Sequence, residues 1–65
     1  MTDFSLSGGG TVYLLHPHNP DAAAWIENYL PEDAMRLGGG VAIEWRYVDD
    51  IVDGIKNCGL TVERV

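Results

Sequence analysis

The chain has 65 residues, of which 46% are hydrophobic, and its ten acidic and four basic residues give a formal net charge of −6. This length suits one small hydrophobic core, and a single cysteine excludes an internal disulfide. No apolar run approaches the roughly 20 residues that cross a bilayer, and the start of the chain lacks the regions of a signal peptide. We therefore expect a cytoplasmic protein. Its acidic surface argues against direct binding to nucleic acid or anionic lipid, because like charges repel.

Residues 1–10 lack hydrophobic periodicity and end in three consecutive glycines. This composition predicts a flexible N-terminus ahead of one small domain over residues 11–65. The glycines are not expected to hold a phosphate, because no strand precedes them and no Lys-Ser or Lys-Thr follows. The first strand is predicted at Thr11–His16, whose uninterrupted apolar character is typical of a central strand.

A helix is predicted to begin at Asn19-Pro20-Asp21, which supply a capping side chain, a preset first residue and a charge that favours the helix dipole. Pro31 ends this helix at Leu30. Its apolar side chains recur at helical spacing and form one stripe: Ala22, Trp25, Ile26, Tyr29 and Leu30.

Residues 31–40 are predicted to form a loop, and the alternation over Val41–Tyr47 predicts a strand with one buried face. The buried face is expected to carry Val41, Ile43, Trp45 and Tyr47.

A second helix is predicted over Val48–Cys58, with Gly59 as its left-handed C-terminal cap and Gly54 allowing a close backbone contact. A last strand follows at Leu60–Val65. The apolar stripe of the helix is expected to contain Val48, Ile51, Val52, Ile55 and Cys58.

The predicted fold is therefore α/β (α+β) with the order β-α-β-α-β, a two-layer sandwich of a three-stranded sheet with both helices on one face. A parallel sheet and a mixed or antiparallel sheet both remain open. The uncovered sheet face suits a partner or a dimer, although every small two-layer domain leaves such a face exposed. Its expected residues are Tyr13, Leu15, Ala42, Glu44, Arg46, Thr61 and Glu63.

No catalytic or metal motif stands out. His16 and His18 lack the further paired ligands of a zinc site, and Cys58 is expected to be an inert core thiol. The carboxylate pairs fall on predicted solvent faces, whereas acid–base catalysis needs two carboxyls in different environments within a cleft. We therefore expect no enzyme activity, no cofactor and no metal.

The acidic residues are the main functional signal. Solubility and helix dipoles explain part of the excess, but Asp49 and Asp53 form a like-charge pair at i and i+4 that weakens an isolated helix. The two helices and the loop would gather carboxylates roughly 5–6 Å apart, near the spacing of phosphates along a nucleic acid strand. The expected contacts to a basic partner surface are Glu27, Glu32, Asp33, Asp49, Asp50 and Asp53, with Asp21 at the margin.

About half of the chain, residues 30–62, resembles small proteins of bacterial mobile elements and phages, mostly of unknown function. In size, charge and lack of catalytic motifs the chain is also similar to type I anti-CRISPR proteins. This resemblance implies a DNA mimic that occupies the basic surface of a Cascade complex, and it carries over no individual residue. The matching motifs are Pro31-Glu32-Asp33-Ala34, Gly38-Gly39, Glu44-Trp45-Arg46-Tyr47, Asp50-Ile51-Val52-Asp53-Gly54 and Gly59-Leu60-Thr61-Val62.

The leading hypothesis is a non-catalytic, monomeric inhibitor that binds the basic surface of a Cascade subunit or another nucleic-acid-binding protein. The alternative is a small accessory interaction module, dimeric through its exposed sheet face. A third reading, a small hydrolase or metal protein, requires His16, His18 and Cys58 to converge.

Overall fold

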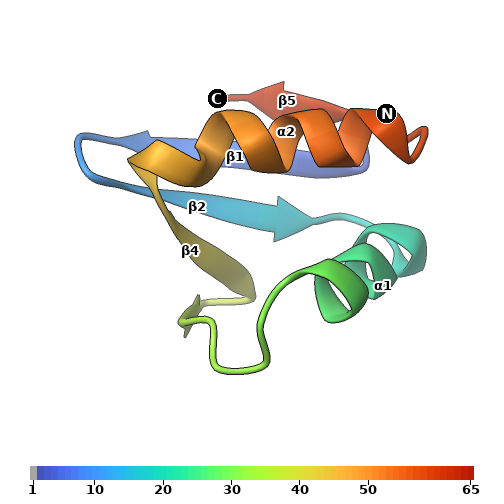
Figure 1. Ribbon diagram of the computed structural model, residues 1–65, viewed down its shortest axis with the longest axis horizontal. Helices are drawn as coiled ribbons and strands as arrows, with labels where there is room; N and C mark the ends of the chain where they lie inside the picture. Colours follow the sequence, from blue (N-terminus) through green and yellow to red (C-terminus); the bar gives the residue numbers. More distant parts are fainter. Residues whose placement is uncertain (1) are drawn as a thin grey trace.

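The computed structural model describes residues 2–65 as a mixed sheet with two helices on one of its faces (Figure 1). The five strands lie in the order β3-β4-β2-β1-β5, where β1 and β5 are parallel and the other neighbours are antiparallel. The two layers agree with the predicted α+β class, but the sheet has five strands rather than three and is mixed. In chain order the elements are β1 (Phe4–Gly9), β2 (Val12–Pro17), α1 (Pro20–Tyr29), β3 (Arg36–Leu37), β4 (Gly40–Glu44), a 3₁₀ helix (Trp45–Tyr47), α2 (Val48–Asn57) and β5 (Val62–Arg64).

Strand β1 corrects the expectation of a flexible N-terminus. It lies between β2 and β5, and its side chains at Phe4 and Leu6 are 0% and 2% exposed. This strand could not be recognised from the sequence, because only two apolar residues alternate within a Gly- and Ser-rich segment. The glycines serve a tight hairpin to β2: Gly10 has a φ of 71°, a conformation that residues with a Cβ rarely adopt.

Strand β2 occupies the centre of the sheet, as predicted, but with the opposite face inward. Leu15 lies opposite Leu6 on one side and Val41 on the other, and it is fully buried in the core. Tyr13 also packs against the core, while Leu14 faces outward. The expected outer positions of Tyr13 and Leu15 were therefore wrong, because an uninterrupted apolar run does not show which face is buried.

Strand β4 is shorter than the predicted strand. Val41 and Ile43 are buried as expected, but the strand ends at Glu44, and the 3₁₀ helix follows with exposed side chains at Trp45 and Tyr47. Trp45 donates its backbone N–H to the Thr11 carbonyl at 2.9 Å. The neighbouring hairpin turns at that point, so no partner strand remains to continue the ladder.

Helix α1 begins as predicted: the Asn19 side chain accepts a hydrogen bond from the Ala22 backbone N–H at 2.8 Å. Tyr29 departs from the expected apolar stripe because it is exposed and stacks on Trp25, with ring centroids 5.1 Å apart. Leu30 remains packed against the core.

Helix α2 also follows its prediction, except at its end. Val48, Val52 and Ile55 are buried and Gly59 has the expected left-handed φ of 80°, but Cys58 is exposed rather than in the core. The apolar stripe thus ends one turn earlier, because the chain leaves the helix at Cys58.

The two helices meet at Gly54 and Trp25. A Cβ atom on Gly54 would lie 3.4 Å from Cζ2 of the Trp25 indole, which is ordinary van der Waals contact, so it is a side chain of α1 that packs at this position of α2. The edge of Trp25 also meets the Phe4 ring, at 5.9 Å between centroids, which links both helices to β1. The Trp25 indole N–H is buried without a hydrogen-bond partner among residues 2–65.

Neither helix of residues 2–65 covers the opposite face of the sheet. Ala42, Glu44 and Glu63 lie there as predicted, but Arg46 belongs to the 3₁₀ helix and Thr61 precedes β5. The side chains on this face are Ser5, Ser7, Val12, Leu14, His16, Ala42, Glu44 and Glu63.

Candidate acidic interaction surface

Helix α2 presents its charged side chains to solvent because its apolar residues are held in the core. Val48, Val52 and Ile55 occupy the buried stripe, so the residues between them point outward. Asp49 and Asp50 lie in the first turn, where the helix dipole favours negative charge. The side chains that project from this helix into solvent are Asp49, Asp50, Asp53, Lys56 and Asn57.

Asp53 is not accounted for by the helix dipole. It follows Asp49 by four positions and Asp50 by three, a helical spacing at which Cβ atoms lie roughly 5–6 Å apart. Within residues 2–65, neither Asp50 nor Asp53 forms an ion pair. Asp50 and Asp53 repel each other at this spacing, and only Asp50 lies in the first turn where the dipole offsets the repulsion, so helix stability does not explain Asp53.

Asp49 has a cationic neighbour that the sequence did not indicate. Arg64 of β5 approaches it with Nη2 at 3.5 Å from Oδ1, and both side chains are largely exposed. Such a pair contributes about 0–1 kcal/mol and is weakened by salt. It forms because β5 runs parallel to β1 beneath α2, an arrangement that depends on the missed N-terminal strand.

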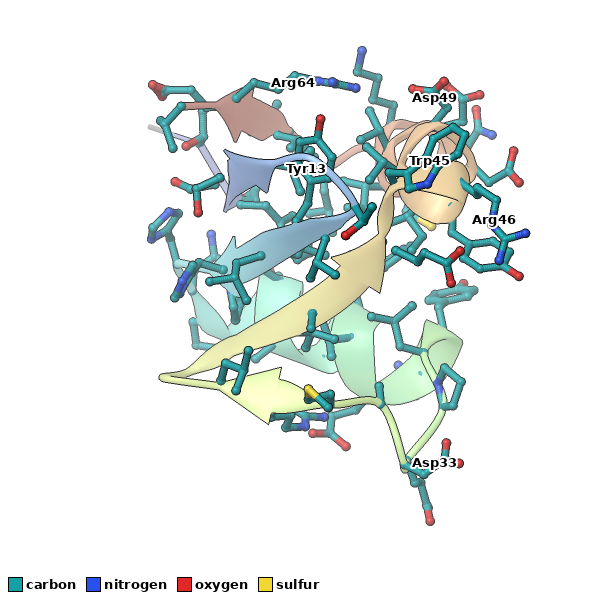
Figure 2. All side chains as sticks on the ribbon, turned by 90° about the vertical axis from the view of Figure 1, so that its left-hand side faces the viewer. Tyr13, Asp33, Trp45, Arg46, Asp49 and Arg64 are labelled. Carbon is teal, nitrogen blue, oxygen red and sulfur yellow. The ribbon has the colours of Figure 1, made fainter. Side chains whose placement is uncertain are left out.

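The other predicted contacts lie elsewhere. Glu27 of α1 pairs with Arg36 of β3, with 3.2 Å between Oε1 and Nη2. Glu32 and Asp33 are exposed in the loop that follows α1. Asp33 and Asp49 lie at opposite ends of the molecule, as Figure 2 shows. The expected single acidic face is therefore two separate groups, one on α2 and one on the loop.

The surface beside the start of α2 is aromatic. Trp45 and Tyr47 are 55% and 54% exposed, whereas the predicted alternation placed both in the core. The Arg46 guanidinium lies over the Tyr47 ring, 5.9 Å from its centroid, and forms an ion pair with Glu44. Sequence reasoning missed this aromatic surface because the strand pattern continued across the 3₁₀ helix.

His16, His18 and Cys58 do not converge. His18 shares a hydrogen bond with the Ser5 hydroxyl, and the His16 ring packs over Gly40, where a Cβ would come within 3.0 Å of it. Cys58 lies at the end of α2 near Tyr29. A hydrogen bond between the two side chains, followed by the charge of the Cys58 thiolate, raises the pKa of the Tyr29 phenol. In the described part of the chain, no three His, Cys, Asp or Glu side chains form a group that could hold a metal ion.

No family model, curated protein or solved structure matches the chain. Neither helix between residues 2 and 65 is both long enough and apolar enough to traverse a bilayer. No pocket was found in the same residues.

Proposed function

We propose that this protein is a non-catalytic inhibitor that binds a basic, nucleic-acid-binding protein surface through the carboxylates of α2. The observation that supports the proposal most directly is the exposed triad Asp49, Asp50 and Asp53, on a helix whose one basic residue is Lys56. A lysine- and arginine-lined groove complements this charge, and attraction over long range speeds the encounter.

The proposed contact involves fewer carboxylates than the sequence predicted. Asp33 lies at the far end of the molecule from Asp49 (Figure 2), Glu32 precedes it in the same loop, and Glu27 belongs to α1, so the proposed contact is confined to α2. The partner would meet the side of the helix that faces away from the core. Because these charges are exposed, their attraction to the partner falls as salt rises.

The most concrete partner is a subunit of a type I Cascade complex in the cytoplasm of a bacterial host. In that role the protein is an anti-CRISPR protein from a phage or mobile element, and its carboxylates take the place of target-DNA phosphates. The support for this identity is the resemblance of residues 30–62 to mobile-element proteins, together with the charge of −6 on 65 residues.

The test is target-DNA binding by purified Cascade in the presence of increasing amounts of this protein. We expect the wild type to displace DNA, and D50N/D53N to need at least about tenfold more protein for half-inhibition, equivalent to about 1.4 kcal/mol. The variant E32Q/D33N removes the same charge at the other end of the molecule and should stay close to the wild type. DNA binding that the wild type leaves unchanged, or full inhibition by D50N/D53N, contradicts the proposal.

A second candidate function rests on the uncovered sheet face. Val12 is 48% exposed there, beside the outward-facing Leu14 and Ala42 of neighbouring positions in the sheet. An accessory module would bind a partner or a second copy through this apolar strip. Light scattering separates the two candidates, because a salt-resistant particle of twice the 7.1 kDa chain mass favours the sheet face. A monomer at all salt concentrations counts against a dimer formed through this face.

A further inference from the structure

The exposed aromatic residues at the start of α2 indicate what kind of basic side chain the partner uses. Trp45 leaves more than half of its surface in solvent, although tryptophan is among the side chains that gain most from burial. Large exposed aromatic surfaces beside charged residues are typical of interaction sites. This observation is independent of the carboxylates on α2.

Tyr47 shows how this surface holds a guanidinium. Arg46 lies over the Tyr47 ring and pairs with Glu44, so one arginine is held by an aromatic face and a carboxylate together. Trp45 offers a second aromatic face, and within residues 2–65 no cation lies over it. Asp49 follows Trp45 by four positions in the continuous helical stretch 45–57, about one turn further on. Figure 2 shows both side chains at the same end of the molecule.

We propose that Trp45 and Asp49 together bind an arginine side chain of the partner protein, with the guanidinium stacked on the indole and paired with the carboxylate. This inference rests on the proposed function and makes it specific: the contacted surface is arginine-rich rather than merely basic. The flat, weakly hydrated guanidinium stacks on aromatic rings and pairs with carboxylates through a fork of N–H groups. A lysine ammonium is compact and strongly hydrated, so it gains less from the indole.

The charge around Trp45 excludes an acidic or nucleic acid occupant. Asp49, Asp50 and Asp53 would repel phosphates, Arg64 only partly offsets Asp49 at 3.5 Å, and the charge of Arg46 is paired with that of Glu44. A second copy of this chain is a poor occupant as well, since each copy carries a net charge of −6. A basic protein is therefore the occupant that the charges fit.

The experiment compares two cationic probes of equal charge, deca-arginine and deca-lysine, added to the ¹⁵N-labelled full-length protein at low salt. The chain has two tryptophans, so two indole N–H resonances are expected, and the variant W45F assigns them. We expect the Trp45 resonance to move with deca-arginine and the buried Trp25 resonance to stay in place. The affinity for deca-arginine should exceed that for deca-lysine by about threefold to tenfold.

Variants separate this inference from the proposed function. W45A should remove the preference for deca-arginine while leaving deca-lysine binding nearly unchanged. The control M35A truncates another exposed apolar side chain, 64% exposed, and should preserve the preference. Equal affinities for the two peptides, an unmoved Trp45 resonance, or no binding of either peptide would overturn the inference. If D50N/D53N instead binds both peptides as tightly as the wild type, the proposed function itself fails.

Discussion

The Asp3 carboxylate joins the two ends of the chain: its Oδ2 accepts a hydrogen bond from the Thr61 backbone N–H at 2.9 Å, across 58 positions of sequence. The Thr61 hydroxyl in turn accepts from the Asp3 backbone N–H at 3.1 Å. The other carboxylate oxygen accepts from the Asn19 amide at 2.7 Å. One side chain thus ties together the starts of β1, α1 and β5, which position the helix that carries the candidate surface.

We expect folding stability to depend on pH through Asp3. The Asn19 amide, followed by the Thr61 backbone N–H, lowers the pKa of this carboxyl in the folded protein. The stabilisation is therefore fully present above the unfolded pKa and is lost as the pH falls through the lower, folded value. D3N should lower the melting temperature at neutral pH, and this loss should shrink as the pH falls through the lowered pKa of Asp3. A loss that stays the same from neutral to strongly acidic pH, measured by circular dichroism, would contradict this assignment.

Asn19 has two roles that substitutions can separate. Its Oδ1 caps α1 through the Ala22 N–H, and its Nδ2 donates to Asp3. N19A removes both hydrogen bonds and should lower the free energy of unfolding by about 1–2 kcal/mol in urea titrations. N19S keeps a capping oxygen but no amide donor, so it should recover part of the loss. If N19S is as unstable as N19A, the cap does not contribute as described.

Substitutions at Gly54 test the packing of the Trp25 indole against α2. A Cβ at this position meets Trp25 at 3.4 Å, which is ordinary contact, so G54A should gain helix propensity of about 0.5–1 kcal/mol. A longer side chain has no space against the indole, and G54L should cost about 1–3 kcal/mol. Chemical denaturation of both variants gives the comparison. A stable G54L variant would mean that the Trp25 indole does not pack against α2 at this position.

Phe4 tests whether the N-terminal segment belongs to the core. A flexible lead-in would tolerate its loss, whereas a fully buried ring predicts a cost of about 3–5 kcal/mol for F4A, close to the whole stability of so small a domain. F4L keeps more volume and should remain folded with a measurable loss of about 1–2 kcal/mol. The control V65A alters an exposed residue and should change stability by less than about 0.5 kcal/mol. If F4A does not change the stability, the N-terminal segment is flexible and does not belong to the core.

The helices could be predicted from the sequence because each carries its own signals. The Asn19 cap and the helical spacing of Ala22, Trp25 and Ile26 are local, and so is the glycine that ends α2. The strands depend on partners far along the chain. Strand β1 contains only two apolar residues, and β3 has two residues in all, so their pairing, rather than their composition, defines them.

The candidate surface could be predicted only in part, for the same reason. The outward direction of Asp49, Asp50 and Asp53 follows from the helical period alone. The separation of Asp33 from Asp49 and the approach of Arg64 depend on the sheet order, which no local pattern encodes. The exposure of Trp45 was missed because the hairpin of β1 and β2 stops where the alternating pattern continues.

The most direct test of the central claim is the affinity of purified Cascade for this protein across a range of salt concentrations. The account predicts that wild-type binding weakens steadily with salt, that D50N/D53N binds at least about tenfold more weakly at low salt with a shallower dependence, and that E32Q/D33N follows the wild type. Identical affinity and identical salt dependence for the wild type and D50N/D53N would contradict a contact made through α2.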